Sequence, residues 1–352
     1  MPQVKWRTCM TTTNELILAV ETSCDETAVA LIRGGKEIVT SIISSQIETH
    51  QRFGGVVPEI ASRKHVESIT LIMEQAMREA GAGFRDLSAI AVTQGPGLVG
   101  ALLVGIVAAK SLAMALDLPL IGTHHIAGHI YANQLVHEIE YPCLALVASG
   151  GHTELVVLES EGKFRIIGRT RDDAVGEAYD KVARTLNFPY PGGPYIDRLA
   201  QQSEEEFQLP RAWLEPDSYD FSFSGLKSAV LAAINSAKMK GETPREAALA
   251  RGFQASVIDV LVTKSLRAVR EVGAKQLLLC GGVAANGGLR AALTARCQEA
   301  GIPLLIPPLK LCTDNAAMIG AAAHLKWKRG EFTPLDMKAE PGLSLEEWSV
   351  RS

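Results

Sequence analysis

The sequence has few aromatic residues, no closely paired cysteines and no apolar run of membrane-spanning length. Aromatic side chains make up 5% of the 352 residues, whereas there are 31 glycines. This balance favours close packing of helices on sheets over aromatic stacking. The longest apolar run, 98–109, has about a dozen residues, which is short of the roughly 20 that a membrane span needs. We therefore expect no membrane segment and interpret this run as a buried helix.

The cysteine spacing and the charge narrow the class of protein further. The six cysteines lie at positions 9, 24, 143, 280, 297 and 312, without a CxxC pair. Such spacing fits neither a disulfide framework nor a zinc ribbon, so we expect free thiols in a reducing compartment. The first residues lack the apolar core of a secretory signal, and we predict a cytoplasmic protein. The net charge of −4 argues against a generally basic surface for nucleic acid, but it allows a local basic patch.

The chain repeats a pattern at an offset of 127 residues. In both 17–32 and 144–159, two apolar runs flank a short polar turn, which predicts a β-hairpin in each half. In both 87–105 and 275–293, an apolar run is followed by glycines and a helical pattern. The length also predicts two domains.

We therefore predict two α/β domains of like fold, 14–133 and 134–330, with a ligand site in the cleft between them. Residues 1–13 and 331–352 are expected to be peripheral extensions.

Three of the eight histidines lie in the segment THHIAGH, 123–129. His125 and His129 are four residues apart, so a helix would place both imidazoles on one face, where they could bind Zn²⁺ or Fe²⁺. The alternative is a pair of histidines that merely line a helix. The zinc-protease pattern HExxH is absent because Ile126 occupies the position of the glutamate. Asp314 is a candidate third ligand, although an aspartate at the start of an Ala-rich helix is also expected to cap that helix.

Two glycine-rich turns, 148–153 and 281–288, offer backbone N–H groups that suit a phosphate ligand. Neither turn matches the P-loop pattern GxxxxGK[ST]. For a single turn, ordinary hairpin chemistry is the simpler explanation. Two such turns in repeated domains make a nucleotide between them a competing explanation.

A specific family resemblance runs through residues 15 to 330. The stretch 110–130, KSLAMALDLPLIGTHHIAGHI, is similar to the signature of the family once called O-sialoglycoprotein endopeptidases and now known as tRNA N6-adenosine threonylcarbamoyltransferases, the TsaD family. Further motifs that resemble the family, in the same order, are ETSCDET, GGVVPEIASRKH, QGPGLVGALLVG, ASGGHT, DDAVGEAYDKVA, YPGGP, FSFSGLK, GGVAAN and TDNAAMIG.

The resemblance implies a fold and a reaction. The fold is a pair of ribonuclease-H-like domains, as in actin, sugar kinases and heat-shock chaperone ATPases, with a cleft between them. The reaction moves a threonylcarbamoyl group from threonylcarbamoyl-adenylate to N6 of the adenosine beside the anticodon, in tRNAs that read codons starting with A, and AMP leaves.

The resemblance also implies site residues and cofactors. By match to the family motifs, His125, His129 and Asp314 would hold one divalent metal, Fe²⁺ or Zn²⁺. The same match assigns an adenine nucleotide or threonylcarbamoyl-adenylate to the cleft and leaves open whether Mg²⁺ accompanies it. The residues implied to line that adenylate site are Ala148, Ser149, Gly150, Gly151, His152, Asp180, Gly193, Asp197 and Asn286.

Two carboxylates in the first hairpin turn are candidates for acid–base chemistry. Glu21 and Asp25 lie in ETSCDET, and we expect them to face the cleft. The exocyclic amine of adenine is a poor nucleophile. We therefore hypothesise that Glu21 or Asp25 positions this amine or accepts its proton.

The resemblance implies tRNA as substrate and several protein partners: a TsaB-like paralogous subunit, a TsaE-like ATPase and a threonylcarbamoyl-adenylate synthase that supplies the donor. Two other classes of function stay open on sequence grounds. A metalloprotease would predict peptide cleavage that chelators abolish. A nucleotide-binding regulatory subunit without catalysis would predict nucleotide binding that does not depend on His125 or His129.

Overall fold

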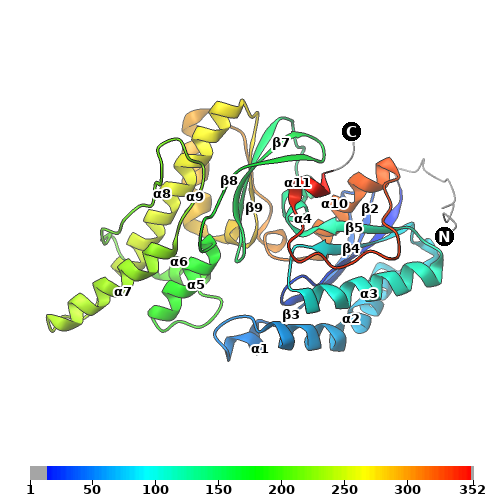
Figure 1. Ribbon diagram of the computed structural model, residues 1–352, viewed down its shortest axis with the longest axis horizontal. Coiled ribbons are helices and arrows are strands. Elements are labelled where there is room, and N and C mark those ends of the chain that lie inside the picture. The colour runs from blue at the N-terminus through cyan, green and yellow to red at the C-terminus, as the bar shows by residue number, and fades with distance from the viewer. Residues whose placement is uncertain (1–13, 350–352) are drawn as a thin grey trace.

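The computed structural model describes residues 14–349 as two five-stranded sheets with helices on their faces (Figure 1). The first sheet consists of β1 (Leu16–Glu21), β2 (Glu26–Arg33), β3 (Glu37–Ser45), β4 (Ala89–Gly95) and β5 (Leu120–His124). The second sheet consists of β6 (Cys143–Ala148), β7 (Thr153–Ser160), β8 (Lys163–Arg169), β9 (Leu277–Cys280) and β10 (Leu304–Leu305).

Helices connect these strands and cover them. The α-helices are α1 (Ile47–Gln51), α2 (Pro58–Ala80), α3 (Val99–Leu116), α4 (His125–Tyr131), α5 (Val175–Thr185), α6 (Gly193–Ala200), α7 (Ser224–Met239), α8 (Glu246–Val272), α9 (Gly287–Ala300), α10 (Ala316–Arg329) and α11 (Leu345–Trp348). Short 3₁₀ turns are η1 (Phe84–Asp86), η2 (Ala132–Leu135), η3 (Gly282–Ala285) and η4 (Leu309–Leu311).

The two sheets have the same topology, which confirms the predicted repeat. Their strand orders are β3-β2-β1-β4-β5 and β8-β7-β6-β9-β10. In each sheet an antiparallel hairpin, β1–β2 or β6–β7, is followed by a parallel strand, β4 or β9, on the other side of the first strand. The central strands β1 and β6 are buried along their whole length, as expected for strands covered on both faces.

Helices α4 and α10 lie between the two sheets. In β1, Leu16, Leu18 and Val20 pack in the apolar cluster that includes residues of α2 and α3, whereas Ile17 and Ala19 pack in the cluster of α10. In β6, the same alternation sends its side chains either towards α8 or towards α4 and α10. Because strand side chains alternate with period two, one pattern builds three helical layers around two sheets. The segment between β5 and β6 therefore lies at the centre of the molecule.

The run 98–109 was predicted to be a buried helix. It is helical, but one face of the helix is exposed. Residues 99–116 form α3, but the side chains of Val99, Leu103, Val107 and Met114 are exposed. By length and composition α3 is long and apolar enough to cross a membrane, with 33% of its residues buried. Core helices of soluble proteins meet the same criteria. One face of α3 packs against α2 and β4, which leaves the opposite apolar face exposed.

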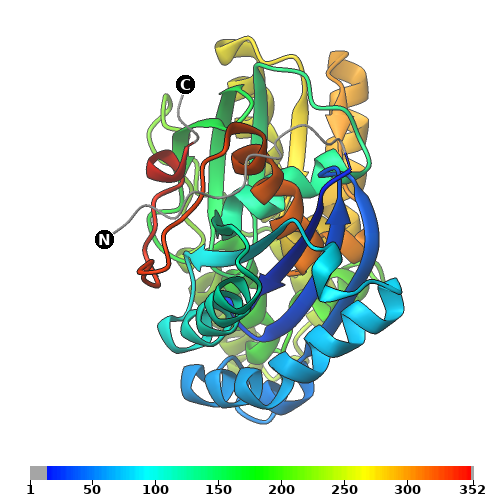
Figure 2. The ribbon, with the colours of Figure 1, turned by 90° about the vertical axis from the view of Figure 1, so that its right-hand side faces the viewer.

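The C-terminal segment is not peripheral as predicted, whereas residues 1–13 lie outside the described residues. Figure 2 shows residues 331–349 running beside the edge of the first sheet. The N–H of Thr333 donates to the Leu120 carbonyl (2.8 Å), and Trp348, 3% exposed, donates its indole N–H to the Gly122 carbonyl (2.9 Å). The N–H of Ile166 in β8 donates to the Glu346 carboxylate (2.9 Å). The segment 331–349 thus joins edge strand β5 of one sheet to edge strand β8 of the other, and below it is called the C-terminal strap.

Candidate metal and nucleotide site

The histidine pair lies on α4, as the spacing predicted. Strand β5 ends at His124, and its buried imidazole accepts the N–H of Ile126 at Nδ1 (3.1 Å), which caps the helix. The other ring nitrogen of His124 donates to the carbonyl of Leu343 in the C-terminal strap (2.9 Å). Burial lowers the pKa of His124 to about 3, so this imidazole is neutral. His124 therefore fixes where α4 starts, and with it the direction of His125 and His129.

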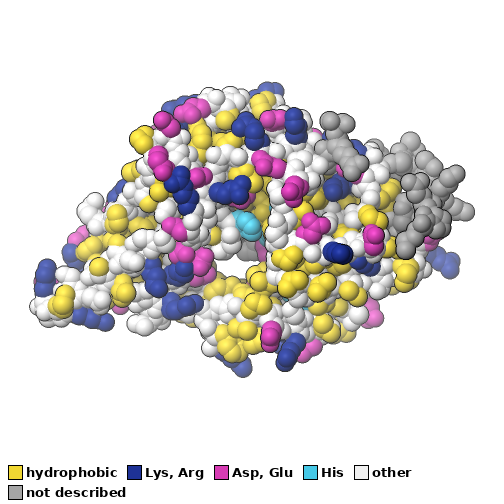
Figure 3. Space-filling model, viewed as in Figure 1, with side chains coloured by type: hydrophobic (Ala, Val, Ile, Leu, Met, Phe, Trp, Pro, Cys, Tyr) yellow, Lys and Arg dark blue, Asp and Glu magenta, His cyan; other side chains and the backbone are white. Residues whose placement is uncertain are grey.

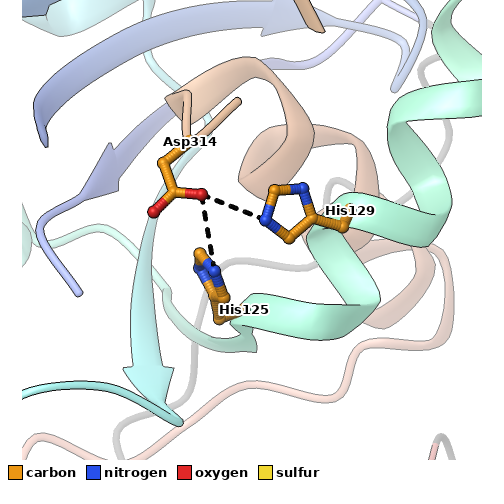
Figure 4. A group of neighbouring side chains, drawn as sticks. All are labelled: His125, His129 and Asp314. Carbon is orange, nitrogen blue, oxygen red and sulfur yellow. Dashed lines mark ion pairs between the residues drawn. The ribbon is translucent and has the colours of Figure 1, made fainter. Parts of the chain in front are cut away.

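Asp314 meets the two histidines from the loop before α10 (Figure 4). Asp314 Oδ1 lies 3.0 Å from His129 Nε2 and 3.6 Å from His125 Nε2. The expected capping role of Asp314 is not observed, because the side chain of Asn315 accepts the N–H of Met318 (3.0 Å) and caps α10 instead. Asn315 therefore leaves the Asp314 carboxylate available to the histidines.

The geometry of the three side chains fits a metal ion. The candidate ligand atoms of His125, His129 and Asp314 all lie within 4.8 Å of one another. Donor atoms about 2.1 Å from one ion are separated by about 3.0 to 3.4 Å in octahedral or tetrahedral geometry, and the distances of 3.0 and 3.6 Å from Asp314 Oδ1 to the two histidines are close to this range. His129 is 1% exposed, and neither of its ring nitrogens makes a well-directed hydrogen bond in the described part of the chain. Buried polar groups normally have a partner, and a metal ion held by these three side chains would supply one for His129.

Glu21 lies behind His125 rather than in the open cleft. Its side chain is fully buried, and Oε2 is 3.1 Å from His125 Nδ1 and 2.6 Å from the hydroxyl of Thr93. The N–H of Ser23 donates to Oε1 (2.5 Å). A carboxylate on the far nitrogen of a ligand histidine fixes the tautomer and the ring orientation. The structure therefore supports a positioning role for Glu21 more directly than the proton transfer hypothesised from sequence.

The charges of this cluster stabilise one another. Burial disfavours the charged imidazolium, but the carboxylates of Asp314 and Glu21 outweigh it and raise the pKa of His125 to about 9. Burial likewise opposes ionisation of Asp314, but the positive charge of His125 and the close approach and charge of His129 hold the pKa of Asp314 well below its usual range. In the absence of a metal, a proton on His125 therefore balances the two carboxylates.

The glycine turn between β6 and β7 lies beside this cluster. The N–H of Ser149 donates to the His152 carbonyl (2.8 Å), and the N–H of His152 donates to the Ser149 hydroxyl (3.0 Å). A methyl group added to Gly150 or Gly151 would meet no atom within 4 Å, so the backbone of the turn borders open space. Burial and the charges of His125 and His129 lower the pKa of His152 to about 4, which places a neutral imidazole next to the metal ligands.

Asp180 lies within α5, and Gly193 is the first residue of α6. Asp180 accepts the N–H of Gly192 (2.7 Å), which holds the loop 188–193 against α5. Burial and the charge of Asp25 raise the pKa of Asp180 to about 6, although the hydrogen bond from Gly192 and the positive charge of Arg184 oppose the rise. Asp25, from the first domain, is thus an electrostatic neighbour of Asp180 in the second. Gly193 has open space around its α-carbon, as Gly150 does.

Asp197 and Asn286 are joined by Gln254, a residue that the motifs did not reveal. The amide of Gln254 donates to Asp197 Oδ1 (3.0 Å), and its oxygen accepts from Asn286 Nδ2 (3.0 Å). Asp197 also accepts the N–H groups of Gly287 and Gly288 at the start of α9 (3.0 and 3.2 Å). Gln254 lies in the middle of α8 and is 7% exposed. No local sequence signal distinguishes it from any other buried position of that helix.

The remaining predicted residues complete the cleft wall. Figure 3 shows a hollow between the two halves of the molecule, with histidine at its wall and acidic side chains nearby. Asp25 is 5% exposed in the turn between β1 and β2. Burial and the charge of Asp25 raise the pKa of Glu26 well above its usual value. The two glycine-rich turns meet at the end of the second sheet, where the Ala148 carbonyl lies so close to Gly281 that a β-carbon there would be 2.4 Å from its oxygen.

Comparison with known proteins gives a close match. A family model described as "TsaD: tRNA N6-adenosine threonylcarbamoyltransferase" matches residues 37–321. A protein of that name from Halalkalibacterium halodurans is 64% identical over 332 residues, which cover 94% of this chain and 97% of the relative. Another from Bacillus cereus is 62% identical over 334 residues, covering 95% of this chain and 97% of the relative.

Solved structures with the same fold are distant in sequence. HypF from T. kodakarensis aligns with a TM-score of 0.61 at 15% identity over 92% of this chain and 49% of its own. Component A of the (R)-2-hydroxyglutaryl-CoA dehydratase of Acidaminococcus fermentans aligns with a TM-score of 0.54 at 16% identity, over 90% of this chain and 98% of its own. These likenesses confirm two ribonuclease-H-like domains.

Proposed function

Because the chain belongs to the family of tRNA N6-adenosine threonylcarbamoyltransferases, we propose that its inter-domain cleft is where threonylcarbamoyl-adenylate and a tRNA adenosine react. The enzyme transfers a threonylcarbamoyl group to N6 of an adenosine in tRNA. The acceptor in this proposal is the adenosine beside the anticodon in tRNAs that read codons starting with A, and AMP is the leaving product. The metalloprotease and the non-catalytic subunit considered from the sequence are set aside by the family match.

The observation that carries the proposed mechanism is the convergence of His125, His129 and Asp314 on one point. These residues would hold one divalent ion, and two histidines with one carboxylate suit Fe²⁺ or Zn²⁺. When bound, such an ion supplies Lewis-acid stabilisation of negative charge on a carbonyl or phosphate oxygen. Glu21 would hold His125 in the orientation this requires. The neutral imidazole of His152 would stand beside the ion and the substrate.

The adenylate would lie along the end of the second sheet, with Mg²⁺ as an accessory ion left open. The backbone of Ala148, Ser149, Gly150, Gly151 and His152 would approach the phosphate, because its N–H groups have no side chain in front of them. Asp197 and Asn286 would bind the ribose hydroxyls, since each keeps a free lone pair or donor beyond its link to Gln254. Asp180 of α5 and Gly193 at the start of α6 would close the site.

Proton removal from the attacking amine is assigned to Asp25 in this proposal. Of the two carboxylates predicted in the first turn, Asp25 faces the second domain, since its charge acts on Asp180, Tyr190 and Glu26. Glu21 is occupied by His125, Thr93 and Ser23. A general base must reach the reacting proton directly or through one water molecule, which favours Asp25.

A TsaB-like subunit would dock on the exposed apolar face of α2 and α3. Val66 and Leu71 of α2 are 63% and 65% exposed, and Val107 and Met114 of α3 are 58% and 69% exposed. Neighbouring exposed apolar side chains of this extent mark protein contact surfaces. A paralogue with the same first domain would present a matching face. A TsaE-like ATPase and a threonylcarbamoyl-adenylate synthase complete the proposed set of partners, in the cytoplasm.

The test is transfer by purified components. The chain, with its partner subunits, is incubated with threonylcarbamoyl-adenylate and an unmodified tRNA transcript, and AMP and the modified nucleoside are measured. We expect both products in equal amounts, loss of both after chelation, and recovery with Fe²⁺ or Zn²⁺, whichever the site prefers. Formation of neither product by the untreated enzyme would contradict the proposal. Undiminished transfer after complete metal removal would contradict the metal assignment alone.

A further inference from the structure

A loop of the first domain stands at the mouth of the cleft. Helix α1 begins next to the Asp25 turn, where the N–H of Gln46 donates to the Asp25 carbonyl (3.1 Å). The loop 52–57 follows α1 and is held by His50, which is fully buried and accepts the N–H of Val57 at Nδ1 (3.3 Å). The tip of the loop carries Arg52 and Phe53, and the Phe53 side chain is 56% exposed.

The second domain meets this loop across the cleft. Arg184, exposed near the C-terminal end of α5, donates from its guanidinium to the carbonyl of Gly54. Helix α5 starts at the glycine turn of the proposed adenylate site, where the N–H of Gly176 donates to the Ser149 carbonyl (3.1 Å). The loop tip and the end of α5 therefore border the same cleft that holds the proposed adenylate site.

Aromatic and basic side chains continue from Arg184 along the second domain. Phe188, four residues further, stacks on Tyr195 of α6 with ring centroids 5.6 Å apart and planes at 18°. Arg198 lies over the Tyr195 ring, 4.8 Å from its centroid. We call this set the rim surface, and its members are Arg52, Phe53, Arg184, Phe188, Tyr195 and Arg198.

The arginines of the rim surface are not neutralised by ion pairs. In the described part of the chain, Arg52 and Arg198 form no ion pair with a carboxylate, and Arg184 donates to a backbone carbonyl. The charge of Arg184 also acts on Asp180, but the two groups are not within ion-pair distance. Two other arginines of the second domain do have carboxylate partners: Arg171 pairs with Glu215 and Asp220, and Arg211 with Glu206 and Asp259. An acidic protein that leaves three arginines unpaired around one opening, beside an exposed phenylalanine, has a local site for a polyanion with bases.

We propose that the rim surface binds the anticodon arm of the tRNA, with Arg52, Arg184 and Arg198 on backbone phosphates and Phe53 stacked on an unpaired base. This inference rests on the proposed function, because it assumes that the target adenosine enters this cleft. A base that is modified inside a cleft must leave its stack, and the loop around it opens with it. Proteins hold such splayed loops by aromatic stacking and by arginine contacts.

The test compares tRNA binding by full-length variants over a series of salt concentrations. Arg52→Glu and Arg184→Glu are expected to weaken binding of unmodified tRNA about tenfold or more and to reduce the slope of log affinity against log salt by about one. Phe53→Ala is expected to weaken binding about tenfold with an unchanged salt slope. Arg85→Glu is the matched control, since Arg85 is exposed in η1 before the start of β4, at the end away from the cleft. AMP binding should be unchanged in the Arg52→Glu, Phe53→Ala and Arg85→Glu variants, whose side chains do not act on the proposed adenylate residues.

Each other outcome has a defined meaning. If the rim variants bind tRNA as the Arg85→Glu control does, or if the wild-type chain does not bind tRNA, the inference is overturned. If they keep tRNA binding but lose binding of a partner subunit, the rim surface is a protein interface and the inference is also overturned. If the wild type binds tRNA through the rim but never forms the modified nucleoside with its partners, the proposed function fails while the inference stands.

Discussion

At the residue scale, the proton on His125 and a metal ion compete for the same nitrogen lone pair. The pKa of His125 is raised from 6.5 to about 9 in the folded protein because Asp314 and Glu21 favour the imidazolium. Metal binding needs the neutral imidazole and releases the proton. We therefore expect the apparent metal affinity to rise about tenfold per pH unit up to about pH 9 and then to level off. Metal titrations at pH 6.5, 7.5 and 8.5 would measure this rise, and a constant affinity would refute the assignment of His125 as a ligand.

The two roles considered for Glu21 give different results for the Glu21→Gln variant. If Glu21 orients His125, the variant should bind metal about 10- to 100-fold more weakly, and transfer should recover in excess metal. If Glu21 is the general base, metal content should be normal and transfer should stay low at every metal concentration. Metal content by elemental analysis and transfer rate are measured together. Glu37→Gln is the control, because it changes an exposed carboxylate paired with Arg33 outside the site.

Gly193 tests the nucleotide site because its surroundings are open. A methyl group added there meets no atom of the protein within 4 Å, and the residue does not have a positive φ. Gly193→Ala should therefore leave the midpoint of thermal unfolding unchanged or slightly higher. If the adenylate lies against this backbone, the methyl group should weaken AMP binding about tenfold. Gly225→Ala, which also meets open space but at the start of α7, should leave AMP binding unchanged, and equal effects of both variants would argue against the site.

The part of the site that depends on spacing along one helix could be predicted from the sequence. The four-residue spacing of His125 and His129 gave the helix face, because α-helical geometry fixes which residues neighbour each other. That Asp314 faces the histidines depends on Asn315 taking the cap, and adjacent Asp and Asn are equally good caps. Gln254 could not be found at all, since its partners come from α6 and from the loop before α9.

At the element scale, the C-terminal strap is part of the core that supports the site. Trp348 packs in the cluster that contains Ile126 and Ile130 of α4. Trp348→Ala should lower the free energy of unfolding by about 3 to 5 kcal/mol, the usual cost of deleting a buried aromatic side chain. Because the strap also binds His124 through Leu343, metal affinity should fall as well. Denaturant unfolding and metal titration measure both, and Trp213→Ala, at a 41% exposed position, is the control.

If the Trp348→Ala variant is as stable as the wild type, the segment 331–349 is peripheral, as predicted from the sequence.

The difference between this prediction and the structure has a physical reason in the sequence. The strap has little regular structure apart from α11, so its prolines and mixed composition predict a loose tail. Its burial comes from contacts with strands 180 or more residues earlier in the chain, which periodicity does not record. The hairpins, in contrast, were predicted correctly because strand, turn and strand are adjacent.

At the scale of the whole molecule, the two halves have the same sheet topology but are not separated at the predicted domain boundary. The proposed boundary between residues 133 and 134 falls within η2. Helix α10, from the second half of the chain, packs on β1 and β2 of the first sheet. The two halves therefore share the layer of α4 and α10, and Asp314 can reach the histidines because of that exchange. A pattern offset of 127 residues predicts two like folds, but it does not predict which helices they share.

The most direct test of the account is nucleoside mass spectrometry on tRNA from cells depleted of this protein. Plasmids would return either the wild-type chain or the His125→Ala/His129→Ala variant, with protein levels matched. We expect N6-threonylcarbamoyladenosine to disappear on depletion and to return with the wild type only. Return of the nucleoside with the double variant would show that the histidine pair is not required for the reaction. An unchanged level after depletion, in cells with no second copy, would contradict the transferase function itself.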